Sequence, residues 1–233
     1  MPYDYGFADA THAALVMQQH MDQISNNLAN VNTTGFKRDR LIFNDLMSRQ
    51  ISTSHEQGPL RYSDNPLDVA LGGDGFFRIM TPRGERLTRD GAFKMLPSGA
   101  LVTSGGLPVL DVAGQPVMLN PMGEKPVITE NGTVFQGLAM INQLGVVDVA
   151  DKNSLIKEGA NLFVGRDSEL PPTFVPEDVS VNQGYTEMPN VQVVSEMVNM
   201  INTHRSYEAY QKTLHVMQDM DSKTVSQVGR INS

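Results

Sequence analysis

The chain has 233 residues, which is long enough for one large domain or two small ones with a real hydrophobic core. A formal net charge of −8 and 40 % apolar residues argue against a basic nucleic-acid surface and against a wholly disordered chain. The absence of cysteine excludes disulfides and thiolate metal sites. No stretch approaches the roughly 18 apolar residues of a membrane span, and no cleaved signal peptide is recognisable. We therefore expect a cytosolic protein, or one that leaves the cytosol without a cleaved signal.

The first expected element is a long amphipathic helix over about residues 9–31. Its apolar residues are spaced alternately by four and three, which is the a/d pattern of a coiled-coil seam. They are Ala10, Ala14, Met17, Met21, Ile24, Leu28 and Val31. Asn32 and Gly35 tolerate positive φ, so the helix should end there. The seam is narrow and needs a partner elsewhere in the chain.

The middle of the chain has a different pattern. Residues 36–60 are expected to form an extended connector, with Lys37 and Arg38 open to trypsin. Residues 61–185 hold most of the Gly and Pro, and short apolar runs alternate there with turn pairs such as Asp90-Gly91 and Asn131-Gly132. Strands are expected near 68–71, 76–80, 86–88, 101–103, 107–110, 116–119, 126–129, 133–136 and 146–149. This part should be an all-β domain.

The last expected element is a second long helix, since residues 191–228 contain neither Gly nor Pro. Val194, Met197, Ile201 and His204 share one face, with His204 expected to be half-buried. After a one-residue slip, Tyr207, Tyr210, Leu214 and Met217 continue it. Both chain ends are therefore apolar-striped helices. The predicted fold class is α+β: residues 1–35 and 186–233 pair as a coiled-coil-like assembly domain, and the β domain is inserted between them.

No pattern of residues predicts catalysis. The five histidines have no metal-ligand spacing, and neither a Gly-x-Ser-x-Gly elbow nor a cysteine nucleophile is present. The Gly72–Phe77 run, GGDGFF, lacks the lysine of a phosphate-binding loop and is interpreted as a tight hairpin turn. Arg89 and Asp90 in LTRDGAF are interpreted first as part of a turn. We expect no enzyme activity, cofactor, metal or small-molecule substrate.

Four sequence blocks resemble one protein family. They are SNNLANVNTTGFKR (25–38), NPLDVALGGDGFFRI (65–79), LTRDGAFKMLPSGALVTSGGLPVL (87–110) and NVQVVSEMVNMINTHRSYEAYQK (190–212). In this order they resemble the axial proteins of the bacterial flagellum, the rod and hook proteins. The length and the compact middle resemble the proximal-rod type most, with the distal-rod type a close alternative.

The resemblance implies a structural subunit whose terminal helices pair and polymerise into a helical tube that carries torque from motor to hook. It also implies export through the flagellar secretion apparatus, a periplasmic position in the basal body, and contacts with other rod proteins and with hook–basal-body junction proteins. The expected assembly interface comprises Ala14, Met17, Met21, Ile24, Asn27, Leu28, Asn30, Val31, Asn32, Gly35, Phe36, Val194, Met197, Ile201, Tyr207, Tyr210, Leu214 and Met217.

Two other readings stay open at this point. One is a distal-rod or hook-type subunit of the same family. The other is a small β-domain binding module carried on a helical stalk. Before assembly the long helices should be marginally stable, because isolated helices gain little in water without a packed apolar face. We therefore expect trypsin to cut the monomer near Arg205 as well, and to leave residues of about 60–185 intact.

Overall fold

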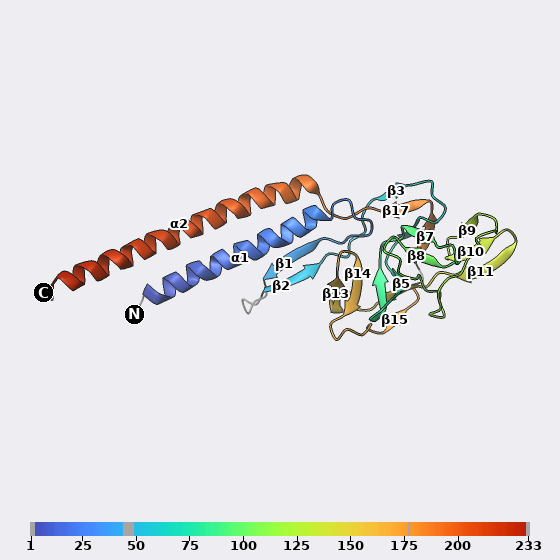
Figure 1. Cartoon of the computed structure of the whole chain (residues 1–233), viewed down its shortest axis with the longest axis horizontal. Coiled ribbons are helices and arrows are strands. Elements are labelled where there is room, and N and C mark those ends of the chain that lie inside the picture. Colours follow the sequence, from blue (N-terminus) through green and yellow to red (C-terminus); the bar gives the residue numbers. More distant parts are fainter. Residues whose placement is uncertain (1–2, 44–48, 177, 232–233) are drawn as a thin grey trace. The chain divides into compact units, whose positions relative to one another are not determined.

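A computed structural model describes residues 3–43, 49–176 and 178–231 of the chain. It separates into two compact units (Figure 1). The first, here called the helical unit, comprises the chain up to Ala29 and from Gln192 onward. The second, here called the body, comprises Asn30–Val191. The predicted fold class is confirmed, because helices from both chain ends pair with each other and an antiparallel β region lies between them in sequence.

The helical unit consists of two helices, α1 (Tyr3–Ala29) and α2 (Val193–Ile231). They lie side by side and antiparallel, with both chain termini at the same end of the pair (Figure 1). α1 begins six residues earlier than the expected Asp9 and ends at Ala29 rather than Val31. Asn30 ends the helix by accepting a backbone hydrogen bond from Thr33 across 3.0 Å. α2 runs without interruption, as the absence of Gly and Pro predicts.

The largest sheet of the body has six antiparallel strands in the order β13-β14-β6-β5-β12-β15. The strands are β5 (Phe76–Thr81), β6 (Gly84–Thr88), β12 (Val146–Val149), β13 (Leu155–Glu158), β14 (Leu162–Gly165) and β15 (Thr173–Phe174). A 3₁₀ turn, Lys152–Ser154, precedes β13. β9 (Pro126–Ile128), β10 (Thr133–Gln136) and β11 (Ala139–Gln143) form a second sheet in the order β11-β10-β9.

Four two-stranded sheets complete the body. They pair β1 (Asp39–Phe43) with β2 (Arg49–Thr53), β3 (Leu60–Tyr62) with β17 (Tyr185–Glu187), β4 (Val69–Gly72) with β16 (Ser180–Gln183), and β7 (Phe93–Met95) with β8 (Leu101–Thr103). The strands β16 and β17, which come last in the body, thus pair with β4 and β3, which come early. This pairing ties the segment that enters the body to the segment that leaves it.

Two apolar clusters form the core of the body. The larger contains Phe77, Ile79, Phe93, Val109 and Leu144, each at most 1 % exposed. The smaller is built around Phe76, Leu87 and Phe163. Phe76 and Phe77 are neighbours on β5 and lie in different clusters, because successive side chains of a strand point to opposite faces. The six-stranded sheet is therefore covered by apolar side chains on both faces.

The strand predictions are confirmed at seven of the nine expected places. Residues 107–110 and 116–119 form isolated bridges instead of strands, such as Ile79 with Val109 and Leu110 with Pro116. Gly72–Phe77 is a bend rather than a hairpin, because β4 pairs with β16 while β5 pairs with β6 and β12. Residues 36–60, expected to be an extended connector, hold the β1–β2 hairpin. Whether the two units fold as separate domains stays a prediction.

Candidate functional site

The assembly residues expected on α1 are mostly shielded within the chain itself. Ala14, Ile24 and Asn27 are buried, and Met17, Met21 and Leu28 are half-buried. Beyond α1, Asn30 and Val31 are half-buried and Asn32 is exposed. The heptad spacing therefore identifies the shielded face of α1. Whether neighbouring subunits also contact this face remains a prediction.

The first half of α2 shields a different face from the one expected, whereas Tyr207, Leu214 and Met217 of the expected stripe are half-buried. The shielded residues of α2 include Glu196, Met200, Thr203, Tyr207, Gln211, Leu214 and Met217, of which Glu196 and Thr203 are fully buried. The Thr203 hydroxyl and His20 Nδ1 on α1 lie in hydrogen-bonding contact at 3.3 Å. The shielded residues follow regular helical spacing along the whole of this face. The one-residue slip of the expected stripe came from counting apolar residues alone, which leaves out the polar but buried Glu196 and Thr203.

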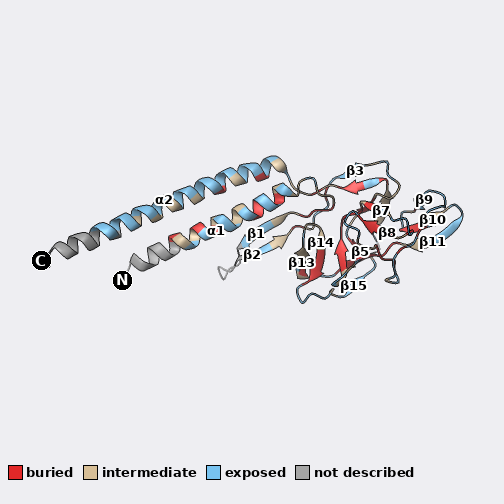
Figure 2. Cartoon of the chain, viewed as in Figure 1, coloured by how far each residue is buried: buried red, intermediate tan, exposed pale blue. Residues whose placement is uncertain are grey.

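An apolar stripe on α2 is left open to solvent. It comprises Val194, Met197, Val198 and Ile201, each more than half exposed, and we call it the outer stripe. Figure 2 shows α2 as exposed over most of its described length, whereas α1 carries several buried positions. Tyr210 is also exposed, farther along α2. Three residues of the outer stripe, Val194, Met197 and Ile201, belong to the expected interface, and Val198 adds a fourth exposed apolar side chain beside them.

The polar residues from 193 to 203 beside the outer stripe carry almost no charge, and the exposed Arg205 follows one turn after Ile201. Ser195, Asn199 and Asn202 are exposed and neutral, and the one acidic residue from 193 to 203, Glu196, is buried. The expectation of a half-buried His204 is wrong: its side chain is 55 % exposed and lies 3.5 Å from Glu208 one turn later. This residue is therefore part of the polar surface of α2.

Three buried charged side chains meet inside the body. Lys37, Arg89 and Glu187 are each about 1 % exposed, and we call them the charge cluster. Lys37 Nζ donates to Glu187 Oε1 across 2.6 Å, and Arg89 donates to Glu187 Oε2 across 3.3 Å. The three residues come from the segment after α1, the end of β6 and the end of β17. The Glu187 carboxylate thus connects the segments in which the chain enters and leaves the body with the end of strand β6.

Hydrogen bonds to the backbone satisfy much of the remaining polarity of the charge cluster. Lys37 Nζ also donates to the Glu56 carbonyl at 2.6 Å, and Arg89 donates to the Gly73 carbonyl at 2.7 Å. The Gly58 amide donates to Glu187 Oε1 at 2.9 Å. Burial lowers the pKa of both Lys37 and Arg89, and the attraction of Glu187 opposes that shift.

The asparagine that opens the last sequence block holds the same region together. The Asn190 side chain accepts from the Arg38 amide at 2.6 Å and donates to the carbonyls of Ser54 and Glu56 at 2.9 and 3.0 Å. The backbone amide of Asn190 donates to the Phe36 carbonyl at 3.4 Å. The entering and leaving segments of the body are therefore hydrogen-bonded to each other directly.

The Thr34–Phe36 segment packs into the body. Thr34 Oγ1 donates to Asp90 Oδ1 at 2.5 Å, and burial raises the pKa of that carboxyl. Gly35 has φ +66°, and a Cβ there would meet the Asp90 amide nitrogen at 2.3 Å. Phe36 is fully buried, with Lys157 Nζ 4.0 Å from the centre of its ring. The structure thus requires a glycine at residue 35.

These contacts correct two expectations. Gly35 and Phe36 were expected at the assembly interface, but both are buried inside the body of their own chain. Lys37 was expected to be open to trypsin, but its side chain is about 1 % exposed and ion-paired. Lys37, Arg89 and Glu187 are far apart in sequence, so spacing gave no signal for the charge cluster. Their only sequence signal is that each lies in or beside one of the quoted blocks.

A histidine lies against the aromatic side of this region. The ring of His55 is 5.8 Å from that of Phe76 and 5.3 Å from that of Phe163. Burial, together with the nearby positive charges of Lys37, Lys152 and Arg89, lowers the pKa of His55 to about 4. The imidazole is therefore neutral near pH 7. At low pH its protonation adds a positive charge close to Lys37, Lys152 and Arg89.

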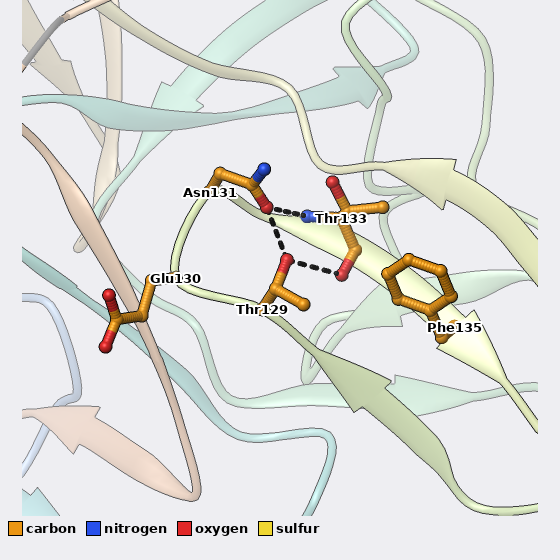
Figure 3. A pocket seen from close by; sticks show the side chains of 5 residues that line it. All are labelled: Thr129, Glu130, Asn131, Thr133 and Phe135. Atoms are coloured by element: carbon orange, nitrogen blue, oxygen red, sulfur yellow. Dashed lines mark hydrogen bonds between the residues drawn. The ribbon is translucent and has the colours of Figure 1, made fainter.

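The residues that the structure describes offer no chemical site. No group of three or more His, Cys, Asp and Glu side chains among them is placed to hold a metal ion. An open hollow of about 560 Å³ is lined by Thr129, Glu130, Asn131, Thr133 and Phe135 (Figure 3). There, Asn131 Oδ1 accepts from Thr129 Oγ1 and the Thr133 amide, which are bonds of a β9–β10 turn. No described helix is long and apolar enough to cross a membrane.

Comparison with known proteins gives three family matches along the chain. Residues 13–37 match the flagella basal body rod protein family, and residues 70–136 match the D1 domain of flagellar hook protein FlgE/F/G. Residues 182–227 match the C-terminal region of flagellar basal body rod FlgEFG proteins. Each member of the charge cluster lies in a different matched region.

Full-length relatives agree with these matches. The chain is 31 % identical to the flagellar basal-body rod protein FlgF of Caulobacter vibrioides, over 94 % of this chain and 95 % of the relative. It is 33 % identical to FlgG of Buchnera aphidicola subsp. Acyrthosiphon pisum (88 % and 93 %) and 30 % identical to FlgG of Bacillus subtilis (84 % and 89 %). The chain belongs to the FlgE/F/G family of flagellar axial proteins and is a flagellar basal-body rod protein, a structural component rather than an enzyme.

Proposed function

We propose that this protein is a proximal-rod subunit. Copies of it pack through their terminal helices into the wall of a shaft that transmits torque from motor to hook. The observation that carries this proposal is the outer stripe of α2. Four large apolar side chains lie on one helix face, and the residues that the structure describes leave each of them more than half exposed. An exposed apolar face of this kind is typical of a protein–protein interface.

The charge distribution supports a neighbouring copy as the occupant of the outer stripe. The whole chain carries a net charge of −8, so two copies repel each other on average. The outer stripe is flanked by the exposed neutral side chains of Ser195, Asn199 and Asn202. Two copies that meet there bury apolar area without having to desolvate ions.

Mechanical demands favour the same arrangement. A shaft that carries torque must resist twisting, and closely packed helices form a dense, poorly compressible wall. Paired helices as long as α1 and α2 gain stability when further helices cover their open faces. Burial in the polymer would supply that gain at about 25 cal/mol for each Å² of apolar surface.

We take FlgF to represent the proximal type and FlgG the distal type, and the alignments favour the first over the second. The FlgF alignment from Caulobacter vibrioides needs 235 positions to cover 94 % of the chain, whereas the FlgG alignment from Buchnera aphidicola needs 245 positions to cover 88 %. The FlgG relatives therefore carry inserted residues that this chain lacks. Contacts with other rod proteins and with the hook–basal-body junction, a periplasmic position, and export by the flagellar apparatus without a cleaved signal belong to the same proposal.

The decisive experiment places a charge on the outer stripe. We expect Ile201→Asp and Met197→Asp to abolish polymerisation and swimming, while circular dichroism and urea unfolding of the body stay as in the parent. Ser206→Asp is the matched control, because it adds the same charge to an exposed residue of α2 outside the stripe and its neutral flank. Normal swimming of both stripe variants would overturn the proposal.

The same substitution at Met21 or Leu28 should also block assembly. These residues are half-buried in their own chain, so such variants combine loss of helix pairing with loss of assembly. The outer stripe gives the cleaner test.

The subtype is tested separately by complementation. We expect expression of this chain to restore swimming in a strain that lacks FlgF and not in one that lacks FlgG. The reverse pattern would assign the chain to the distal type and leave the helix-packing proposal intact.

A further inference from the structure

None of the large apolar or aromatic side chains of the β3–β17 ladder is buried, so apolar burial does little to fix its register. It is a separate two-stranded sheet that pairs Leu60 with Glu187, Arg61 with Thr186, and Tyr62 with Tyr185. All three residues of β3 are exposed, as is Tyr185, whereas Thr186 and Glu187 are buried. Register is specified strongly only where one face of a strand pair is buried by an apolar pattern. A slip by two residues would keep the same faces outward and reform equivalent backbone hydrogen bonds.

The carboxylate of Glu187 ties this ladder to fixed points in the body. Its Oε1 accepts from the Gly58 amide, two residues before β3, and from Lys37 Nζ. Its Oε2 accepts from Arg89 at the end of β6. A Cβ at Gly58 would meet the Met188 carbonyl oxygen at 1.9 Å, so the chain after Glu187 also passes directly over Gly58.

A slip of the ladder would separate these charges. Two residues of a strand span about 7 Å, which is far beyond hydrogen-bond reach. Lys37 and Arg89 would remain in an environment where each is about 1 % exposed, without their counter-ion. Breaking a buried ion pair in this way is strongly unfavourable, whereas replacing the whole group with apolar residues is often neutral or stabilising.

We propose that the charge cluster is a register lock, which specifies one alignment of β3 against β17 and contributes little to net stability. α1 ends at Ala29, shortly before Lys37, and α2 begins at Val193, shortly after Glu187. The lock therefore sets the lengths of chain that connect the body to the two helices. The register lock acts within the folded monomer and does not depend on polymerisation.

Engineered cysteines read the register directly, because the chain has no cysteine of its own. Tyr62 and Tyr185 face each other with ring centres 5.3 Å apart. They flank the Ser63–Gly184 backbone bond, so they form a close, non-hydrogen-bonded pair that a disulfide can bridge. The pair Tyr62→Cys with Tyr185→Cys reports the native register. Leu60→Cys with Tyr185→Cys and Asp64→Cys with Tyr185→Cys report two-residue slips in the two directions.

In the parent we expect oxidation to join only the native pair. In the lock-free variant K37M/R89M/E187L, we expect a slipped pair to form at least ten times more disulfide than in the parent, while circular dichroism shows a folded body. The control is R78M/E85L, which removes an ion pair of the same body outside the cluster and should leave the register unchanged.

A folded lock-free variant that still joins only the native pair would overturn the proposal. If that variant does not fold, the experiment uses Lys37→Met alone. In that variant Glu187 still has Arg89 and the Gly58 amide as hydrogen-bond partners. We expect at least a threefold rise in the slipped disulfide there, and no rise in that variant would equally overturn the proposal. The cross-links are scored in dilute monomer, so a failure of the assembly proposal gives a separate result.

Discussion

The helical unit and the body use the same residue types in opposite ways. In the body, Phe76, Phe77 and Phe163 are buried in two clusters, and the buried cations Lys37 and Arg89 are paired with a carboxylate. In the helical unit, Thr203 and Glu196 are buried while Val194 and Ile201 lie in the open. The body therefore has an apolar core of its own, and we propose that neighbouring copies cover the exposed stripe of the helical unit.

The two units also divide the sequence blocks that identify the family. The first block contains the last turn of α1, with the shielded Asn27 and Leu28, but its residues from Thr34 to Lys37 pack into the body. The last block begins with Asn190, which hydrogen-bonds the body backbone, and continues into the outer stripe. The blocks therefore combine residues that pack into the body with residues of the proposed assembly surface.

The largest effect on stability is expected from breaking the charge cluster on one side only. Glu187→Leu leaves Lys37 and Arg89 buried without a counter-ion, so we expect the free energy of unfolding of the body to fall by about 3–5 kcal/mol in urea titrations. Glu85→Leu is the matched control, because its partner Arg78 is partly exposed and such pairs contribute at most about 1 kcal/mol. Equal losses in the two variants would show that burial of the cluster has no special weight.

A smaller loss is expected from adding one methyl group at the edge of the body. Gly35→Ala forces an alanine to φ +66° and into the Asp90 backbone, and we expect it to cost about 3 kcal/mol. Gly106→Ala separates backbone strain from steric clash. Gly106 has φ +81°, but no atom lies within 4 Å of the added Cβ. We expect about 1 kcal/mol there from backbone strain alone. A similar cost at both glycines would mean that Gly35 is needed only for its backbone angle.

The body should also be sensitive to acid through His55. Its pKa is about 4 in the folded body, against 6.5 for an ordinary histidine. Between these values the unfolded chain binds more protons, so the free energy of unfolding falls as the pH drops from 6.5 towards 4. We expect this contribution to be roughly 2 kcal/mol, allowing for the partial exposure of the ring.

Urea titrations of the parent and of His55→Gln at pH 6.5 and 4.5 measure that difference. The parent should lose more stability than the variant, which has no imidazole to charge. His204→Gln serves as the control, because His204 is exposed on α2. A parent and a His55→Gln variant with the same pH dependence would contradict the role of His55.

How well the sequence predicts this structure depends on how local each signal is. Helical periodicity predicts α1 and α2 because 3.6-residue spacing is a property of each segment alone. It does not predict which face of α2 is shielded, because that face includes the polar Thr203. This residue contacts His20 of α1, which is distant in the sequence. Strands with alternating apolar residues, such as β5, are predicted. Strands such as β13 and β16 are missed, because neither LIKE nor SVNQ alternates clearly between apolar and polar residues. The partner of β16, β4, is also distant in the sequence.

The charge cluster lies beyond any local signal. Lys37, Arg89 and Glu187 meet only because β3 pairs with β17 and the segment after α1 packs beside them. A lysine and an arginine read in isolation suggest solvent exposure, since such residues are rarely fully buried unless they are paired. The resemblance to a family marks the blocks that contain them, but it gives no contact between the blocks.

The smallest effect is expected at the contact between the two helices. Thr203→Val removes the hydroxyl that meets His20 and keeps the shape of the side chain, so we expect a loss of about 1 kcal/mol. Thr213→Val is the matched control, since the Thr213 hydroxyl bonds only the Ala209 carbonyl of its own helix. Amide hydrogen exchange should show faster opening of both α1 and α2 in Thr203→Val, with the exchange of the body unchanged. An equal loss of protection in the body would mean that the two units unfold together, and the body would then not be complete without the helices.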